Sequence, residues 1–314
     1  MALRPYNAII RLLFLSLLVA SCDSTGSETD PIPDRNQIYW TDQDAGKIHR
    51  ANLDGSDVKD LVSGLDGPRH IVFDVDNGKM YWTEGRFGDP FISKIKRANL
   101  NGSDVEELVS GFFGHNGIAL DTAGGKMYWT WTGIDAFSGA IQRANLDGSD
   151  FETLPLEGLA TERDLPGLPN PQDIALDIAA GKMYWGIPGV IQCANLDGST
   201  FEDLITGLGF PGGIALDRAE GKIYWTSFNI ISRTGKIQRA NLDGSDVEDL
   251  VTDLSIPGGI ALDVDNGKMY WTDRPQSPDN LPGKIQRANL DGSNIEDLVT
   301  DLESPWGIAL LLLE

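Results

Sequence analysis

Short runs of alternating hydrophobic and polar residues, separated by Asn-Gly and Asp-Gly pairs, recur along most of the chain. In one unit the runs span 259–263, 268–272, 284–290 and 295–299. Alternation with a period of two is typical of strands with one buried face. Asn-Gly and Asp-Gly pairs favour the positive φ angles of tight hairpins. The unit therefore predicts four short antiparallel strands, denoted a to d.

Tyr-Trp opens a recurring tetrapeptide in strand b. Its six copies begin at Tyr39, Tyr81, Tyr128, Tyr184, Tyr224 and Tyr270, at intervals of 42, 47, 56, 40 and 46 residues. Periods of this length, with four strands in each, are typical of the blades of a β-propeller. The repeat therefore predicts an all-β propeller built from four-stranded antiparallel blades.

The two ends of the repeat region are complementary. The first strand b, at 37–41, has no strand a before it, and the last strand a, at 306–310, has no strand b after it. If the two pair, six strands a serve six strands b and no sheet edge is left open. We therefore predict a six-bladed propeller over residues 37–314, closed by the C-terminal strand pairing with the N-terminal one.

Three motifs, Tyr-Trp-Thr-Asp, Ile-x-Arg-Ala-Asn-Leu-Asp-Gly and Pro-x-Gly-Ile-Ala-Leu-Asp, together resemble the YWTD propeller, or low-density lipoprotein receptor class B repeat, over residues 37–310. The resemblance implies a six-bladed fold that binds extended peptides over the channel mouth. The full tetrapeptide occurs only in the first and last copies, Cys193 replaces a repeated arginine, and Leu311 replaces a repeated aspartate. The sequence shows none of the cysteine-rich modules that flank the animal receptors' propellers, so lipoprotein uptake is not expected.

Two sets of repeated residues fit a structural role. The tryptophan of each copy is expected to pack between adjacent blades, as the side chains of Trp40, Trp82, Trp129, Trp185, Trp225 and Trp271. The aspartates that end strand a allow two interpretations, a calcium loop or a hairpin turn; they are Asp74, Asp121, Asp177, Asp217 and Asp263. The turn is favoured, because the further ligands of a calcium-binding loop are missing.

The connections on one face of the predicted disc vary, whereas those on the other do not. The b-to-c stretch ranges from 4 to 12 residues, and one d-to-a stretch, from Leu156 to Asp173, has eighteen where the others have eight. The variable face also holds the aromatic residues outside the repeat, namely Trp131, Trp306, Phe87, Phe91, Phe112, Phe113, Phe137, Phe210 and Phe228. These either fill loops or form a binding rim.

The two residues before each strand-a Ile are expected at the mouth of the central channel. Around the ring they are Arg69-His70, Asn116-Gly117, Gln172-Asp173, Gly212-Gly213, Gly258-Gly259 and Trp306-Gly307. We take as candidate ligand-binding residues Arg69, His70, His115, Asn116, Gln172, Asp173, Trp306, Trp131 and Phe87. The alternative is that Arg69 and Asp173 pair with neighbouring groups and close the channel.

Residues 1–21 have the pattern of a signal peptide. Arg4 and Arg11 precede an apolar run of nine residues, 12–20, which is too short to span a bilayer. The run meets Val19-Ala20-Ser21-Cys22, which resembles a bacterial lipobox and predicts acylation of Cys22, by palmitate or a similar acyl chain. A plain secretory signal is the alternative. Residues 22–36 are expected to be a polar tether, which places the propeller on the bacterial cell envelope, outside the cytoplasmic membrane.

Charge and cysteine content narrow the possible partners. The formal net charge is −22, with 25 basic and 47 acidic residues. Such an acidic chain is not expected to bind nucleic acid or to adsorb directly to an anionic membrane, so contact with the membrane should be through the lipid anchor alone. Two cysteines cannot form a disulfide scaffold if Cys22 is acylated. We expect a monomer with no cofactor and no bound metal.

Catalytic motifs are absent from the sequence. It has no Gly-x-Ser-x-Gly, His-Glu-x-x-His or glycine-rich phosphate loop. His49 occupies a strand position that is glutamine in four other repeats. The leading hypothesis is a non-enzymatic binding module that recognises a protein, peptide or glycan through the variable face. The alternative is a metal-dependent lactonase of the gluconolactonase type, to which Asn116 and Asp173 could contribute ligands.

Overall fold

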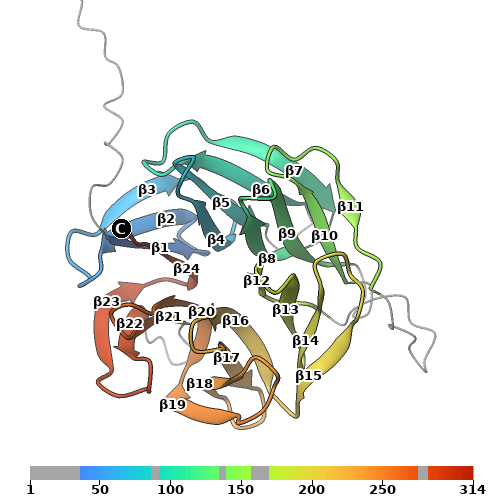
Figure 1. The fold of residues 1–314 in the computed structure, drawn as a ribbon. Helices are drawn as coiled ribbons and strands as arrows, with labels where there is room; N and C mark the ends of the chain where they lie inside the picture. The colour runs from blue at the N-terminus through green and yellow to red at the C-terminus, as the bar shows by residue number, and fades with distance from the viewer. Residues whose placement is uncertain are drawn as a thin grey trace, which may run out of the picture.

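The computed structural model describes residues 36–85, 92–112, 114–133, 139–156, 170–274 and 282–313. These residues form six four-stranded antiparallel sheets that surround a central axis (Figure 1). The predicted six-bladed, all-β propeller is therefore confirmed. No helix long and apolar enough to cross a membrane occurs in the described part of the chain.

Each blade runs from strand a to strand d. Blade 1 is β24 (Pro305–Leu311), β1 (Gln37–Asp42), β2 (Lys47–Asn52) and β3 (Lys59–Ser63). Blade 2 is β4 (Pro68–Asp74), β5 (Lys79–Glu84), β6 (Ile92–Asn99) and β7 (Glu106–Phe112). Blade 3 is β8 (Gly114–Asp121), β9 (Lys126–Thr132), β10 (Ala140–Asn145) and β11 (Glu152–Thr153).

The second half of the ring repeats this order. Blade 4 is β12 (Ile174–Asp177), β13 (Lys182–Ile187), β14 (Val190–Asn195) and β15 (Glu202–Thr206). Blade 5 is β16 (Phe210–Asp217), β17 (Lys222–Asn229), β18 (Thr234–Asn241) and β19 (Glu248–Leu254). Blade 6 is β20 (Ile256–Asp263), β21 (Lys268–Arg274), β22 (Gly283–Asn289) and β23 (Glu296–Leu302).

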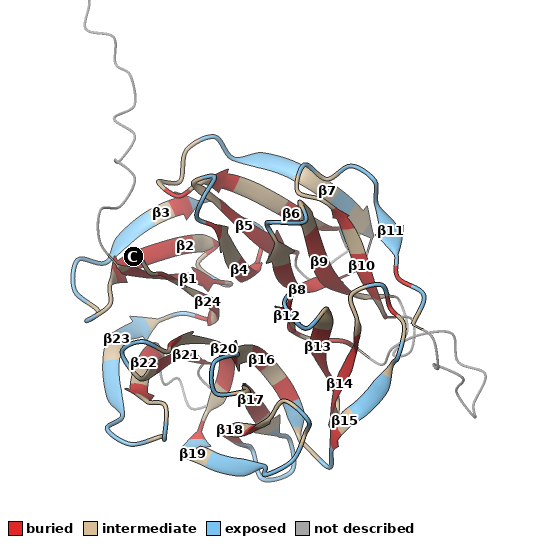
Figure 2. Cartoon of the chain, viewed as in Figure 1, coloured by how far each residue is buried: buried red, intermediate tan, exposed pale blue. Residues whose placement is uncertain are grey.

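Blade 1 closes the ring from both ends of the chain. β24 pairs antiparallel with β1, with Leu310 opposite Ile38 and Ala309 opposite Tyr39. The predicted shared blade is confirmed. Strand a of every blade lines the central channel, and strand d lies at the outside of the ring, where it carries most of the exposed strand residues (Figure 2). Buried residues gather on the inner three strands.

The repeated tryptophans lie between blades, as predicted, and each is fully buried. Trp82 of blade 2, for example, packs in one cluster with Val62 and Leu65 of blade 1. In blades 3 to 6 the indole N–H donates to the glutamine of strand c at 2.9 to 3.1 Å, which satisfies its only polar group. Truncating such a side chain typically costs about 3–5 kcal/mol.

The strand-a aspartates stabilise hairpin turns. The carboxylate of Asp74 accepts from the backbone N–H of Asn77 at 3.3 Å, and Asp217 accepts from that of Glu220 at 3.0 Å. Gly78 then adopts the positive φ of 63° that completes the first of these turns. The aspartates therefore serve the hairpin turns, as the turn interpretation predicted. Among the described residues, no three His, Cys, Asp or Glu side chains are grouped to hold a metal ion.

Strand a carries a β-bulge where the channel opens. In blades 2, 3, 5 and 6 the register with strand b shifts across two residues, which are Arg69-His70, Asn116-Gly117, Gly212-Gly213 and Gly258-Gly259. A bulge leaves backbone groups outside the ladder. The threonine of Tyr-Trp-Thr meets this need. Thr226 Oγ1 accepts from Gly213 N at 2.9 Å and donates to Gly258 O of the next blade at 2.6 Å.

The same arrangement, which we call the threonine joint, recurs around the ring. Thr41, Thr83, Thr130 and Thr272 donate to the bulge carbonyls of Arg69, Asn116, Gln172 and Trp306 in the following blade. All five threonines are fully buried. Each joint therefore ties strand b of one blade to strand a of the next at the channel mouth. The third residue of the repeated tetrapeptide thus connects blades.

Blade 4 lacks the threonine joint, because Gly186 stands in its place. The carboxylate of Asp173 makes the connection instead. Its Oδ1 accepts from Ile174 N and its Oδ2 from Ile214 N of blade 5, both at 2.9 Å. A Cβ at position 186 would lie 2.8 Å from the side chain of Pro211, so threonine cannot fit there without a shift.

A second tie between blades lies at the opposite face. The strand-c arginine donates to the tyrosine hydroxyl of its own blade and to a backbone carbonyl of the next, as Arg239 does to Tyr224 at 3.1 Å and to Leu290 at 3.2 Å. Arg97 and Arg143 do the same. Blade 4 lacks this tie too, because Cys193 replaces the arginine. Burial raises the pKa of the Cys193 thiol to about 12.

Restoring the arginine should therefore strengthen the joint between blades 4 and 5. We expect Cys193→Arg to raise the free energy of unfolding by about 1–2 kcal/mol, since it would reach Glu202, Tyr184 and the carbonyl of Leu242. The matched variant Arg239→Cys should lower it by a similar amount. Urea denaturation followed by tryptophan fluorescence measures both; a destabilised Cys193→Arg would contradict the assignment of this tie.

Candidate functional site

A pocket of about 220 Å³ lies at the channel mouth over blades 5, 6 and 1. The bulge glycines of blades 5 and 6 form its floor. Its walls combine apolar side chains with a few polar ones, namely Phe210, Phe228, Ile230, Ile256, Trp306, His70, Asn170, Gln172 and Arg274. We refer to it as the mouth pocket. A mainly apolar pocket with a few polar groups is the usual form of a ligand site.

Two arginines lie close to the Trp306 ring. The guanidinium of Arg274 lies 3.7 Å from the centre of the indole and that of Arg69 5.4 Å from it. Burial lowers the pKa of both arginines to about 10, and for Arg274 the charge of Arg69 adds to this effect. Both groups therefore stay charged at neutral pH. The Nε of Arg274 is buried with no hydrogen-bond partner among the described residues.

The predicted residues Arg69, His70, Asn116 and Asp173 come together beneath the mouth pocket. Arg69 donates to Asn116 Oδ1, and Asn116 Nδ2 donates to Thr132 Oγ1 at 2.9 Å and to Pro171 O at 2.8 Å. His70 Nδ1 lies 3.0 Å from Asp173 Oδ1. The structure thus uses Asn116 and Asp173 for connections within the protein. His70, Gln172 and Trp306 line the pocket.

His115 and Trp131 are not among the residues that line the mouth pocket. They face each other across β8 and β9, and His115 is 3 % exposed, with its ring edge against Trp129. Trp131 packs against the core cluster between blades 2 and 3. The sequence predicts His115 near the mouth because it precedes Asn116, and Trp131 on the variable face because it lies in a b-to-c connection. Phe87, Phe91, Phe113, Phe137 and the N-terminal segment with Cys22 lie outside the described residues.

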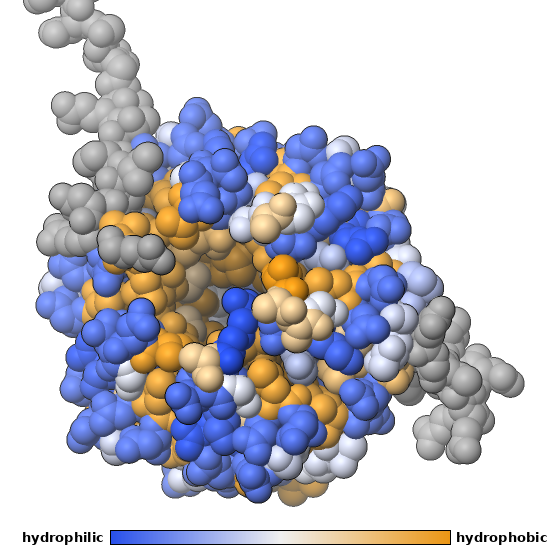
Figure 3. Space-filling view, viewed as in Figure 1, coloured by the Kyte–Doolittle hydropathy of each residue, from blue (hydrophilic) through white to orange (hydrophobic). Residues whose placement is uncertain are grey.

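The rim of the mouth pocket is apolar and exposed at the β17–β18 turn. Ile230 is 61 % exposed, Ile231 91 %, and Phe210 beside them 38 %. Phe210 and Phe228 face each other across β16 and β17. Figure 3 shows the other end of the channel, seen from the face of the a–b and c–d turns, with hydrophobic residues around the central hollow and hydrophilic ones over most of the periphery. Sequence inspection missed Arg274 and the two isoleucines, whose only signal was their place in variable connections.

Beyond the mouth, the channel holds a second cavity of about 300 Å³, lined by strand-a residues such as Ile71, Ile118 and Ile260. His70 borders both this cavity and the mouth pocket. The lactonase hypothesis requires cation ligands here. Both carboxylate oxygens of Asp173 already accept backbone N–H groups, and Asn116 Oδ1 accepts from Arg69. The oxygens of these two residues are therefore already engaged within the protein.

Sequence comparison gives a short local match. No family model matches the chain. A stretch of 49 residues, 15 % of the chain, is 45 % identical to mouse low-density lipoprotein receptor-related protein 5. The stretch spans 3 % of the length of that receptor-related protein. The match agrees with the similarity to YWTD repeats and covers about one blade.

Structural comparison supports the fold over most of the chain. A chain from a nidogen/laminin complex matches with a TM-score of 0.70 at 21 % identity, covering 88 % of this chain and 98 % of that one. TolB from Acinetobacter baumannii matches with a TM-score of 0.70 at 13 % identity, over 88 % of this chain and 66 % of that one. A putative 6-phosphogluconolactonase from Bacteroides uniformis reaches 0.56 at 10 % identity, over 89 % of this chain and all of that one.

The buried His115 makes stability depend on pH. Burial lowers its pKa from 6.5 to about 4, so between these values the unfolded chain binds a proton that the folded protein does not. The contribution of His115 should therefore lower the free energy of unfolding by up to about 3 kcal/mol as the pH drops from 6.5 to 4. Above pH 6.5 and below pH 4 this contribution should not change with pH. The variant His115→Gln should lose this part of the pH dependence in denaturant titrations; an identical profile would contradict it.

Proposed function

We propose that this propeller is a non-enzymatic binding module of the cell envelope that recognises a segment of a partner protein at the mouth pocket. The observation that carries the proposal is the exposed apolar rim of Ile230, Ile231 and Phe210 around a pocket that contains a stacked Arg274–Trp306 pair. Aromatic residues and arginine provide most of the binding energy in protein interfaces. Exposed apolar patches of this kind usually have a partner.

The charge at the mouth favours an acidic group in the ligand. The protein as a whole carries a net charge of −22, yet Arg69 and Arg274 place two positive charges within 5.4 Å of the centre of the Trp306 ring. Their mutual repulsion is one cause of the lowered pKa of Arg274. A ligand carboxylate near Arg274 would offset it, while apolar ligand side chains rest on Phe228 and Ile230. We therefore favour an extended peptide with an acidic residue beside apolar ones.

The family and location form part of the same proposal. Six in-register motif copies and the local identity to a receptor-related protein support a YWTD-type propeller. Residues 1–22 support a lipoprotein signal, so we propose that Cys22 is acylated and that residues 22–36 tether the propeller outside the cytoplasmic membrane. The fold matches to TolB and to a putative lactonase, at 10–14 % identity, support only the propeller architecture.

The binding role can be tested with two exposed isoleucines on opposite faces. Ile231→Ser should weaken capture of the native envelope partner, because Ile231 is at the mouth rim. Ile295→Ser, which changes a 49 % exposed isoleucine beside the uniform c–d turn, should not. Arg274→Ala should abolish capture, since it removes the cation and uncovers Trp306; losses above about 2 kcal/mol are typical of such central residues.

The measurement is crosslinking and pull-down from the native cell envelope, with melting temperature as the folding control. Equal capture by wild type, Ile231→Ser and Arg274→Ala, at unchanged melting temperature, would contradict the placement of the site. Loss of capture by Ile295→Ser alone would move the site to the uniform face.

The anchor gives a separate prediction. Cys22→Ser should release the protein from the membrane fraction while leaving the propeller folded, because acylation requires the thiol. A single acyl chain anchors a protein only marginally, so a variant with fewer chains should not stay on the membrane. Labelling with a radioactive fatty acid measures it: label on wild type and none on the variant is expected. Absence of label from both would refute acylation, and the segment would then be a plain secretory signal.

A further inference from the structure

One position on the variable face holds a carboxylate in three of the six blades. The residue after the threonine joint is Asp42 in blade 1, Glu84 in blade 2 and Asp273 in blade 6. These carboxylates are at most 4 % exposed. Asp42 accepts from the backbone N–H groups of Glu303 at 3.1 Å and Ser304 at 2.9 Å, and Asp273 accepts from that of Ser255 at 3.2 Å. In blades 1 and 6 a buried carboxylate thus accepts hydrogen bonds from the backbone of the d–a connection.

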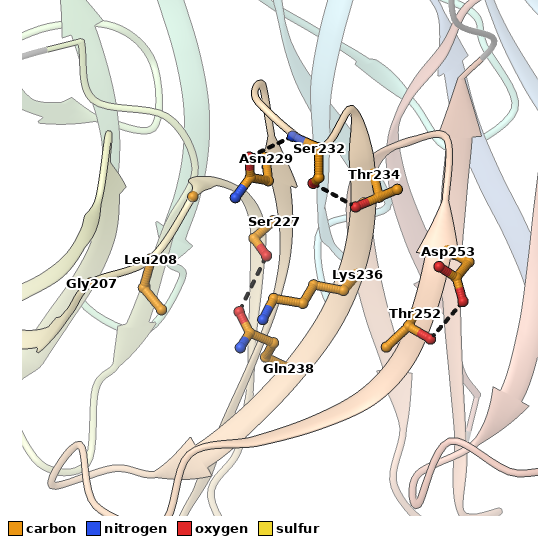
Figure 4. A pocket seen from close by; sticks show the side chains of 12 residues that line it. Gly207, Leu208, Ser227, Asn229, Ser232, Thr234, Lys236, Gln238, Thr252 and Asp253 are labelled. Carbon is orange, nitrogen blue, oxygen red and sulfur yellow. Dashed lines mark hydrogen bonds between the residues drawn. The ribbon is translucent and has the colours of Figure 1, made fainter.

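Blade 5 lacks this carboxylate. Ser227 stands in its place, and Gly209 occupies the position of Ser255 and Glu303. Two residues earlier, Gly207 stands where the connection that leads into β20 has Asp253, and a Cβ on Gly207 would meet nothing within 4 Å. The shorter side chains leave a cavity of about 280 Å³, shown in Figure 4. We call it the blade-5 crevice.

Several hydrogen-bond donors of the blade-5 crevice have unused capacity. The N–H of Gly209, whose counterparts bind carboxylates, has no acceptor among the described residues. Asn229 uses Oδ1 to accept from Ile231 N and Ser232 N, and its amide nitrogen points toward Ser227 (Figure 4). Lys236 Nζ lines the crevice and donates to Asp249 at 2.9 Å, which leaves donor capacity unused.

The acceptors of the blade-5 crevice are mostly engaged. Gln238 Oε1 accepts from Trp225 at 3.1 Å and from Ser227 at 3.2 Å. The hydroxyls of Ser232 and Thr234 lie 2.8 Å apart and bond to each other, and Thr252 donates to Asp253. Asp253 Oδ1 accepts no hydrogen bond from the described residues, so the crevice also offers an acceptor. The crevice therefore suits a ligand that combines a carboxylate, for Gly209 N–H and Lys236, with hydroxyl groups.

We propose that the blade-5 crevice binds a small hydroxylated carboxylic acid, of the class that includes uronic acids. Its carboxylate takes the place that Asp42 and Asp273 fill in other blades, and accepts from Gly209 N–H and Lys236. Its hydroxyl groups contact the hydroxyls of Ser232 and Thr234 and the amide of Asn229. The cavity volume is at the low end for ligand sites, which selects a single small ring. This site is separate from the mouth pocket.

The test uses sodium glucuronate as the probe and protein labelled with ¹⁵N-glycine. Glucuronate should move the amide resonance of Gly209 downfield, as a new bond to a carboxylate forms, whereas glucose at matched salt should leave it in place. Ser227→Asp supplies the carboxylate from within the protein. It should show the shifted Gly209 resonance without ligand and weaken glucuronate binding by at least about tenfold.

Two further variants keep the outcome independent of folding and of the mouth pocket. Lys236→Met, which keeps most of the side-chain stem, should weaken glucuronate binding, while Arg274→Ala should bind it as wild type does. An unshifted Gly209 resonance at saturating glucuronate, or an equal response to glucose, would overturn the proposal. Ser227→Asp that binds glucuronate as wild type does would overturn it as well.

Discussion

The hydrogen bonds of a buried threonine hydroxyl at the end of strand b hold the backbone at the channel mouth in place. The bulge in strand a leaves an N–H in one blade and a C=O in the next without ladder partners. Thr226 satisfies both, by accepting from Gly213 and donating to Gly258. A hydroxyl is the smallest group that can accept and donate at once. Leaving either backbone group unpaired in the core would cost about 1–3 kcal/mol, so these joints fix how strand a enters the channel.

Both candidate sites adjoin the place where this pattern changes. Blade 4 has neither the threonine joint nor the arginine tie, because Gly186 and Cys193 replace the two residues that make them, and Asp173 carries the connection to blade 5. The β16–β17 pair of blade 5 then separates the two pockets. Ser227 and Gly209 line the crevice, while the next residues, Phe228 and Phe210, line the mouth pocket. Alternation along a strand thus presents one pair to each site.

The sequence was sufficient for the architecture, because strand period, turn chemistry and repeat spacing are local properties. It placed all six tryptophans between blades and paired the two ends of the chain correctly. It was less informative at the mouth. His115 and Asn116 are neighbours in sequence, yet the bulge turns His115 into the core. Arg274 gave no signal beyond its place in a variable connection, because its contribution is the stacking on Trp306, a candidate residue that lies 32 positions further along the chain. Such contacts depend on tertiary packing rather than on pattern.

Hydrogen exchange at the bulge amides tests most directly whether the joints hold the mouth. The relevant amides are those of Gly117, Gly213 and Gly307, bound to threonine, and of Ile214, bound to Asp173. The account predicts that all four exchange only through global unfolding, as slowly as the core of strand b. Exchange of these amides at the rate of the exposed c–d turns would contradict it.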